Sequence, residues 1–203
     1  MLNRSVAFVG VFVLVLAAFV GGCGGQKAPA EAAIASAETA FAAVQAEAVK
    51  YLPDQAMGVA DAIAGAKAAL GKGDYQAALT AAQALPGKIS ELSTAMAAKK
   101  TELTAAWTSL SESMPKVVEV IQSRIGILSK SKALPAGLDA AKFDQAKSGL
   151  ASLTSAWTEA TTAFGAGNLT EAVAKAGSAK SLAVTVMNLL NMQVPAALQA
   201  EGK

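Results

Sequence analysis

The sequence predicts an all-α protein, an antiparallel bundle of about five or six helices, and three observations support this prediction. Alanine, the residue with the highest helix propensity, accounts for 49 of the 203 residues. Apolar residues recur at spacings of three and four along most of the chain, which is the period of an amphipathic helix. Glycine and proline stand between these segments. The best strand candidate, residues 117–128, also fits a helical period.

The first two helices are expected over residues 30–50 and from Pro53 onward. The second begins with proline, which suits a first helical turn because its missing N–H has no helical partner there. A Gly-Lys-Gly segment from Gly71 to Gly73 ends this helix, with glycine as the C-cap. Asp74 then has the side chain and position of an N-cap for the next helix.

The third helix is expected from Tyr75 to about Met114. Pro86-Gly87 lies inside it and predicts a kink or a break, because an interior proline removes a hydrogen bond. Pro115 predicts the start of a further helix, whose apolar stripe runs to Leu128.

The last long helices are expected after a polar loop at residues 129–137. One spans residues 138–165 and ends at a Gly-Ala-Gly turn. Asn168 is the predicted N-cap of the next, which runs to about Gln193. Residues 194–203 are expected to form a short frayed tail.

Two segments 94 residues apart, 73–82 and 167–176, share one pattern. Each has glycine, then a capping Asp or Asn, an apolar residue, and alanine three residues further on. This predicts two αα-hairpins, at about 53–92 and 138–193. The spacing resembles the tetratricopeptide (TPR) hairpin, whose small helix-contact positions are matched by Ala66, Ala78, Ala160 and Ala172. The copies are not in tandem and the larger aromatic positions are mostly alanine, so the resemblance implies the hairpin and not a peptide-binding groove.

The N-terminal residues 1–22 have the features of a signal peptide. Arg4 supplies one positive charge, and the apolar run over 6–20 is shorter than the ~20 residues of a transmembrane helix. Val20-Gly21-Gly22 stands directly before Cys23, the one cysteine of the chain. This arrangement resembles the lipobox of bacterial lipoproteins.

The lipobox resemblance implies that Cys23 is lipidated after cleavage of the signal peptide. Two or more acyl chains hold a protein firmly on a membrane. Gly24, rather than aspartate, follows the cysteine, which favours the periplasmic face of the outer membrane over the inner membrane. Residues 23–30 would then tether a single α-helical domain, residues 31–203. An uncleaved membrane anchor and an ordinary secretory signal are the alternatives.

A second resemblance covers residues 28–92. Ala28-Pro29, Tyr51-Leu52-Pro53 and Gly73-Asp74-Tyr75 with Ala78 carry it. They resemble a group of Ala-rich helical envelope lipoproteins of Gram-negative bacteria. This likeness implies an envelope helical domain and no particular activity.

Composition argues against several classes of function. The chain has no histidine and one cysteine, which removes histidine-based catalysis and Cys/His metal sites. A net charge of +2 is too small to suggest nucleic-acid binding. Most carboxylates lie three or four residues from a lysine, the spacing of solvated helix-face pairs. Examples are Lys99 with Glu102, Asp144 with Lys147, and Glu171 with Lys175. We therefore expect no enzymatic activity, no cofactor and no metal.

The expected role is that of a lipid-anchored scaffold or adaptor that binds another envelope component. The alternative is a small apolar-ligand carrier with a pocket between helices near Trp107, Trp157 and Phe164. Both tryptophans are also natural packing anchors. The segments 103–108 and 153–158 are similar in sequence, and this similarity would place the two tryptophans at equivalent positions on their helices. Arg124, inside an apolar stretch, completes the set of candidate contact residues.

Overall fold

The computed structural model describes residues 25–199, and within them the protein is all-α, as predicted. Residues 1–22, the expected signal peptide, and Cys23 lie outside the described residues. The helices are α1 (Lys27–Tyr51), α2 (Pro53–Gly71), α3 (Tyr75–Lys130), α4 (Ala140–Gly165), α5 (Leu169–Leu189) and α6 (Ala196–Gln199). None of the described helices is long and apolar enough to span a bilayer.

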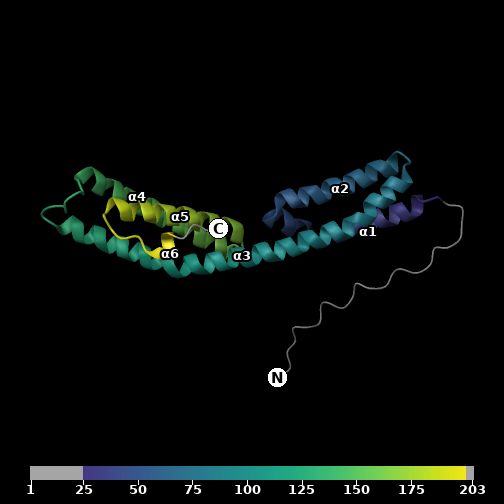
Figure 1. Ribbon diagram of the computed structural model, residues 1–203. Coiled ribbons are helices and arrows are strands. Elements are labelled where there is room, and N and C mark those ends of the chain that lie inside the picture. The colour runs from purple at the N-terminus through teal and green to yellow at the C-terminus, as the bar shows by residue number, and fades with distance from the viewer. Residues whose placement is uncertain (1–24, 200–203) are drawn as a thin grey trace, which may run out of the picture.

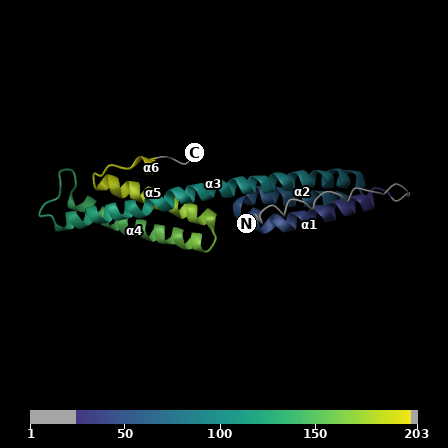
Figure 2. The same ribbon diagram turned by 90° about the horizontal axis from the view of Figure 1, so that it is seen from below.

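The helices form two three-helix bundles that share α3 (Figure 1). Helices α1 and α2 pack on its first part, and α4 and α5 pack on the remainder (Figure 2). The beginning of α1 and the α2–α3 turn lie at one end of the molecule, and the α3–α4 loop lies at the other (Figure 1). Whether the two bundles fold as a single domain stays a prediction.

Helix α3 is continuous, so of the kink or break expected at Pro86 the break does not occur, and the helix start expected at Pro115 is wrong. Figure 1 shows one long, gently bowed helix. Both prolines lie on its exposed face, whereas nearby Leu85, Ile89 and Met114 are buried in the two bundles. An interior proline costs ~3 kcal/mol, and each buried apolar side chain contributes ~1.5–3 kcal/mol. Packing on both sides of each proline therefore maintains the helix.

The two hairpin turns have the same hydrogen bonds, 94 residues apart. In the first, the N–H groups of Lys72, Gly73 and Asp74 donate to the carbonyls of Ala68, Leu70 and Ala69. In the second, the corresponding donors and acceptors are Ala166, Gly167 and Asn168 with Thr162, Phe164 and Ala163. Both central glycines are left-handed, with φ of +80° and +75°. The predicted repeat is thus a repeated turn, while its likeness to TPR hairpins stays a prediction.

The caps of the two return helices differ. The Asp74 carboxylate accepts a hydrogen bond from the N–H of Ala77, as an N-cap does. Asn168 occupies the predicted N-cap position of α5, but its side chain makes no capping bond and its amide lies 3.4 Å from Glu171.

Small residues allow the hairpin helices to approach closely. Ala66, Ala78, Ala160 and Ala172 are all fully buried. Gly149 serves the same purpose between α4 and α5, since a Cβ there would lie 2.6 Å from Cγ2 of Val186. Close packing of this kind requires the absence of larger side chains.

The apolar core has two parts. One occupies α1, α2 and α3 as far as Met96. The other begins at Trp107 and consists of two clusters joined by Leu110 and Trp157. The tail contributes to this second part, because Leu198 in α6 is buried; the expectation of a frayed tail is therefore wrong for residues 196–199.

Candidate functional site

Three of the four predicted contact residues form one aromatic cluster. Trp107 in α3 stacks on Trp157 in α4, with ring centroids 5.7 Å apart, and on Phe164, at 4.4 Å. Both pairs have an interplanar angle of 11°. Trp157 and Phe164 are seven residues apart, so they share a helix face, and antiparallel packing brings that face to α3.

Alanine makes the space that these rings fill. Ala160, Ala172 and Ala176 are fully buried beside Trp107, whose own exposure is 8%. The cluster therefore has the packing role expected of tryptophan anchors. The two tryptophans stack on one another, and the sequence similarity between segments that are 50 residues apart did not predict this contact.

Phe164 differs from its neighbours because it remains 47% exposed. It lies near the C-terminal end of α4, next to the turn into α5. An aromatic ring that is stacked on one face and open to solvent on the other is suited to contact with a partner. Phe164 is thus the most exposed member of the cluster, because Trp107 is buried and Trp157 is partly buried.

Arg124 lies apart from the aromatic cluster. It follows Trp107 by 17 residues in α3, which corresponds to about 25 Å along the helix. Its side chain is half-buried, and its Nε atom has no hydrogen-bond partner within the described residues. The structure therefore does not combine Arg124 with the rings into one site.

The α4–α5 turn beside the cluster contacts the end of α1. Nζ of Lys50 donates to the carbonyl oxygen of Gly167 at 2.6 Å, and the Thr170 hydroxyl donates to the Lys50 carbonyl at 3.5 Å. Sequence reasoning missed these residues because more than a hundred positions separate the partners. No local periodicity carries such information.

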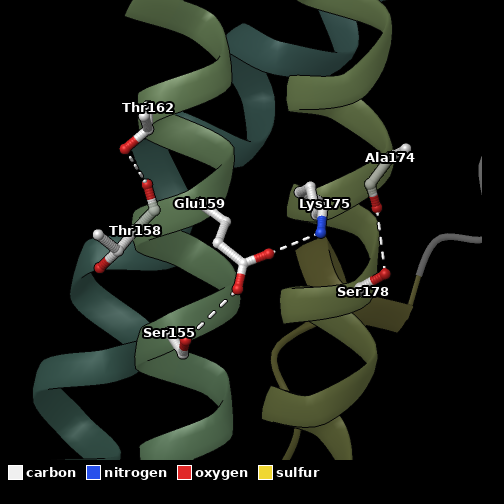
Figure 3. A network of polar contacts seen from close by, with 7 residues as sticks. All are labelled: Ser155, Thr158, Glu159, Thr162, Ala174, Lys175 and Ser178. Atoms are coloured by element: carbon white, nitrogen blue, oxygen red, sulfur yellow. Dashed lines mark hydrogen bonds and ion pairs between the residues drawn. The ribbon is translucent and has the colours of Figure 1, made fainter.

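Several lysines pair with a neighbouring helix instead of their own. Lys175 in α5 bonds Glu159 in α4 at 2.6 Å, and the Ser155 hydroxyl lies 3.5 Å from the same carboxylate (Figure 3). The hydrogen bond and charge of Lys175 lower the pKa of Glu159, and those of Glu159 raise the pKa of Lys175. Local spacing had instead suggested a pair of Lys175 with Glu171.

The other ion pairs are of two kinds, those between two helices and those within one helix. Lys67–Glu38 and Lys100–Glu47 join two helices. The pairs Lys99–Glu102 and Lys147–Asp144, both predicted by spacing, lie within one helix. These carboxylates neutralise surface lysines, and residues 25–199 contain no cluster of three or more Cys, Asp or Glu side chains suited to a metal ion.

Surface hollows occur elsewhere on the described part of the molecule. One of about 680 Å³ lies at the end of the first bundle where α1 begins, and its lining includes Lys27, Lys67 and Lys72 with Ile34 and Leu70. Smaller hollows of about 230 and 330 Å³ lie beside Val59 and Leu189. All three are open, and the aromatic cluster lines none of them.

Comparison with known proteins yields no assignment. No protein-family model matches the chain, and no curated protein or solved structure is significantly similar to it. The function must therefore be inferred from the residues of this chain.

Proposed function

We propose that this protein is a lipid-anchored, non-catalytic scaffold or adaptor of the bacterial cell envelope that binds another envelope component. The observation that carries the proposal is the lipobox-like Val20-Gly21-Gly22 before Cys23. Cys23 stands four residues before Lys27, the first residue of α1. Acyl chains on Cys23 would hold this end of the first bundle at the periplasmic face of the outer membrane.

The elongated shape supports a scaffold role. Helix α3 has 56 residues and thus a length of about 84 Å. Its far end carries the α3–α4 loop, opposite the beginning of α1 (Figure 1). Attachment at Cys23 would therefore leave the second bundle, with the exposed ring of Phe164, accessible to an envelope partner.

The arrangement of the rings does not support the carrier alternative. A carrier needs a pocket that encloses most of its apolar ligand. Trp107 and Trp157 instead stack on one another, and neither lines a described hollow. Their contact fills the space that a ligand would need.

Lipid attachment can be tested by labelling cells with radioactive palmitate and separating their membranes. The native chain and a Gly24→Ala control should incorporate label and sediment with membranes, whereas Cys23→Ser should do neither. A Cys23→Ser protein that remains on membranes, together with a native chain that incorporates no label, would refute the anchor.

The adaptor role can be tested with a photo-crosslinking amino acid placed at Phe164 in intact cells. A matched control carries the same group at Asp61, an exposed position in α2 of the first bundle. We expect a discrete crosslinked product with an envelope protein from position 164 and not from position 61. Absence of a product at position 164, or the same products from both positions, would count against this surface as the partner site.

A further inference from the structure

The apolar stripe of α3 is interrupted between the two bundles. Met96 is buried in the first part of the core, and the next buried residue is Leu103. Lys99 stands between them where the stripe would continue, and it is bonded to Glu102 at 2.9 Å. Trp107 and Met114 are also seven residues apart, and the residue three positions after Trp107 is Leu110, which packs into the core.

The hydrogen bonds of Lys50 with Gly167 and Thr170 cross between the bundles, and both are exposed. Within the first bundle, Lys100 of α3 pairs with Glu47 of α1 and lies 5.3 Å from the centre of the Tyr51 ring. Such contacts are individually weak because water competes for both partners. The bundles are therefore joined mainly by α3 itself.

Residues 97–102 of α3 contain no buried side chain, and their contact with α1 through Lys100 and Glu47 is exposed. A helix in a protein gains most of its stability from burial of an apolar face, so this part of α3 gains less than the buried parts on either side. The exposed hydroxyl groups of Thr101 and Thr104 donate to the carbonyls of Ala97 and Lys100, as other hydroxyl groups do elsewhere along α3. Hydroxyl bonds of this type weaken and bend helices slightly.

We propose that residues 97–102 of α3 form a hinge that allows the two bundles to change their relative orientation. The hinge opens by local fraying of one to two helical turns, while the buried segments on either side remain folded. Lys99 has the central role, because a lysine at this core position prevents the two parts of the core from becoming continuous. The proposal depends on the packing of α3 and is independent of lipid attachment.

Hydrogen exchange of the full-length chain tests the hinge. Amides of residues 97–102 should exchange roughly tenfold or more faster than those of the buried stretches 85–92 and 117–125. Lys99→Leu, which fills the gap in the stripe, should slow exchange of residues 97–102 roughly tenfold. Lys116→Leu is the matched control, since Lys116 is exposed on the same helix, and it should leave this exchange unchanged.

A distance measurement tests the motion itself. Spin labels at Lys72→Cys and Ser131→Cys, in a Cys23→Ser background, report the separation of the two ends. We expect a broad distribution that narrows with Lys99→Leu and not with Lys116→Leu. Equal protection of residues 97–102 and 85–92, or a single narrow distance in the chain with native Lys99, would overturn the hinge. Retained protection of residues 85–92 in each variant verifies that the bundles remain folded.

Discussion

Gly149 allows α4 and α5 to pack at close range. Whether its replacement by alanine raises or lowers the free energy of unfolding depends on the neighbouring side chain of Val186. Alanine in a helix interior normally stabilises by about 0.5–1 kcal/mol relative to glycine. At position 149 the new Cβ would lie 2.6 Å from Cγ2 of Val186, which is buried. Valine in a helix has one strongly preferred rotamer, so its methyl group cannot easily rotate away.

The magnitude follows from these two opposing terms. Overpacking costs about 1–3 kcal/mol and exceeds the gain in helix propensity, so Gly149→Ala should lower the free energy of unfolding by about 0.5–2 kcal/mol. Val186→Ala alone should cost about 2–3 kcal/mol through lost burial and a cavity. In that background the nearest remaining atom is Cβ of residue 186, at an ordinary 4.0 Å. There Gly149→Ala should stabilise by about 0.5–1 kcal/mol.

Urea unfolding of the four proteins in this double-mutant cycle measures the coupling, expected at about 1–3 kcal/mol. Gly126→Ala is the control, because a Cβ at this helical position meets nothing within 4 Å, and it should be stabilising. A Gly149→Ala variant that is as stable as Gly126→Ala would refute the close approach. So would an equal cost of Gly149→Ala in both backgrounds.

Three further predictions concern the turns, the surface charge and the long helix. Gly167→Ala should destabilise by about 1–2 kcal/mol in urea unfolding because φ is +75°, whereas Gly165→Ala, which is helical and equally unobstructed, should not. The pKa of Glu159 is lower in the folded protein than in the unfolded chain, so its pair with Lys175 stabilises the folded state at pH values above the ordinary carboxyl pKa. This stabilisation is lost as the pH falls through the pKa that Glu159 has in the folded protein. The stability difference between Glu159→Gln and the native chain should therefore be small at neutral pH and vanish in acid. Pro86→Ala should stabilise by up to about 2–3 kcal/mol if α3 is continuous there, and an unchanged or lowered urea midpoint would contradict that continuity.

The sequence predicted the members of the candidate site and their proximity, but not their stacking. Trp107 and Trp157 are the two tryptophans of the chain, and Phe164 follows Trp157 by seven residues on the same helix face. Their stacking depends on the antiparallel approach of α3 and α4, which a single chain pattern does not specify. Arg124 belonged to the same predicted set, but the length of α3 places it about 25 Å away.

Ion pairs show the same limit. Spacing correctly predicted Lys99–Glu102 and Lys147–Asp144, since residues three apart on a helix are neighbours. It could not predict that Glu47 pairs with Lys100, or Glu159 with Lys175, because those contacts depend on how two helices are aligned.

The sequence by itself determined the helical class, most helix ends and the repeated turn. These features depend on local interactions, such as the Asp74 cap and the left-handed Gly73 and Gly167, which act within a few residues. Tertiary structure decided that α3 runs through Pro86 and Pro115 and that it joins two bundles. The physical reason is that burial against distant helices outweighs a local proline cost, and such burial depends on partners that are remote in the chain.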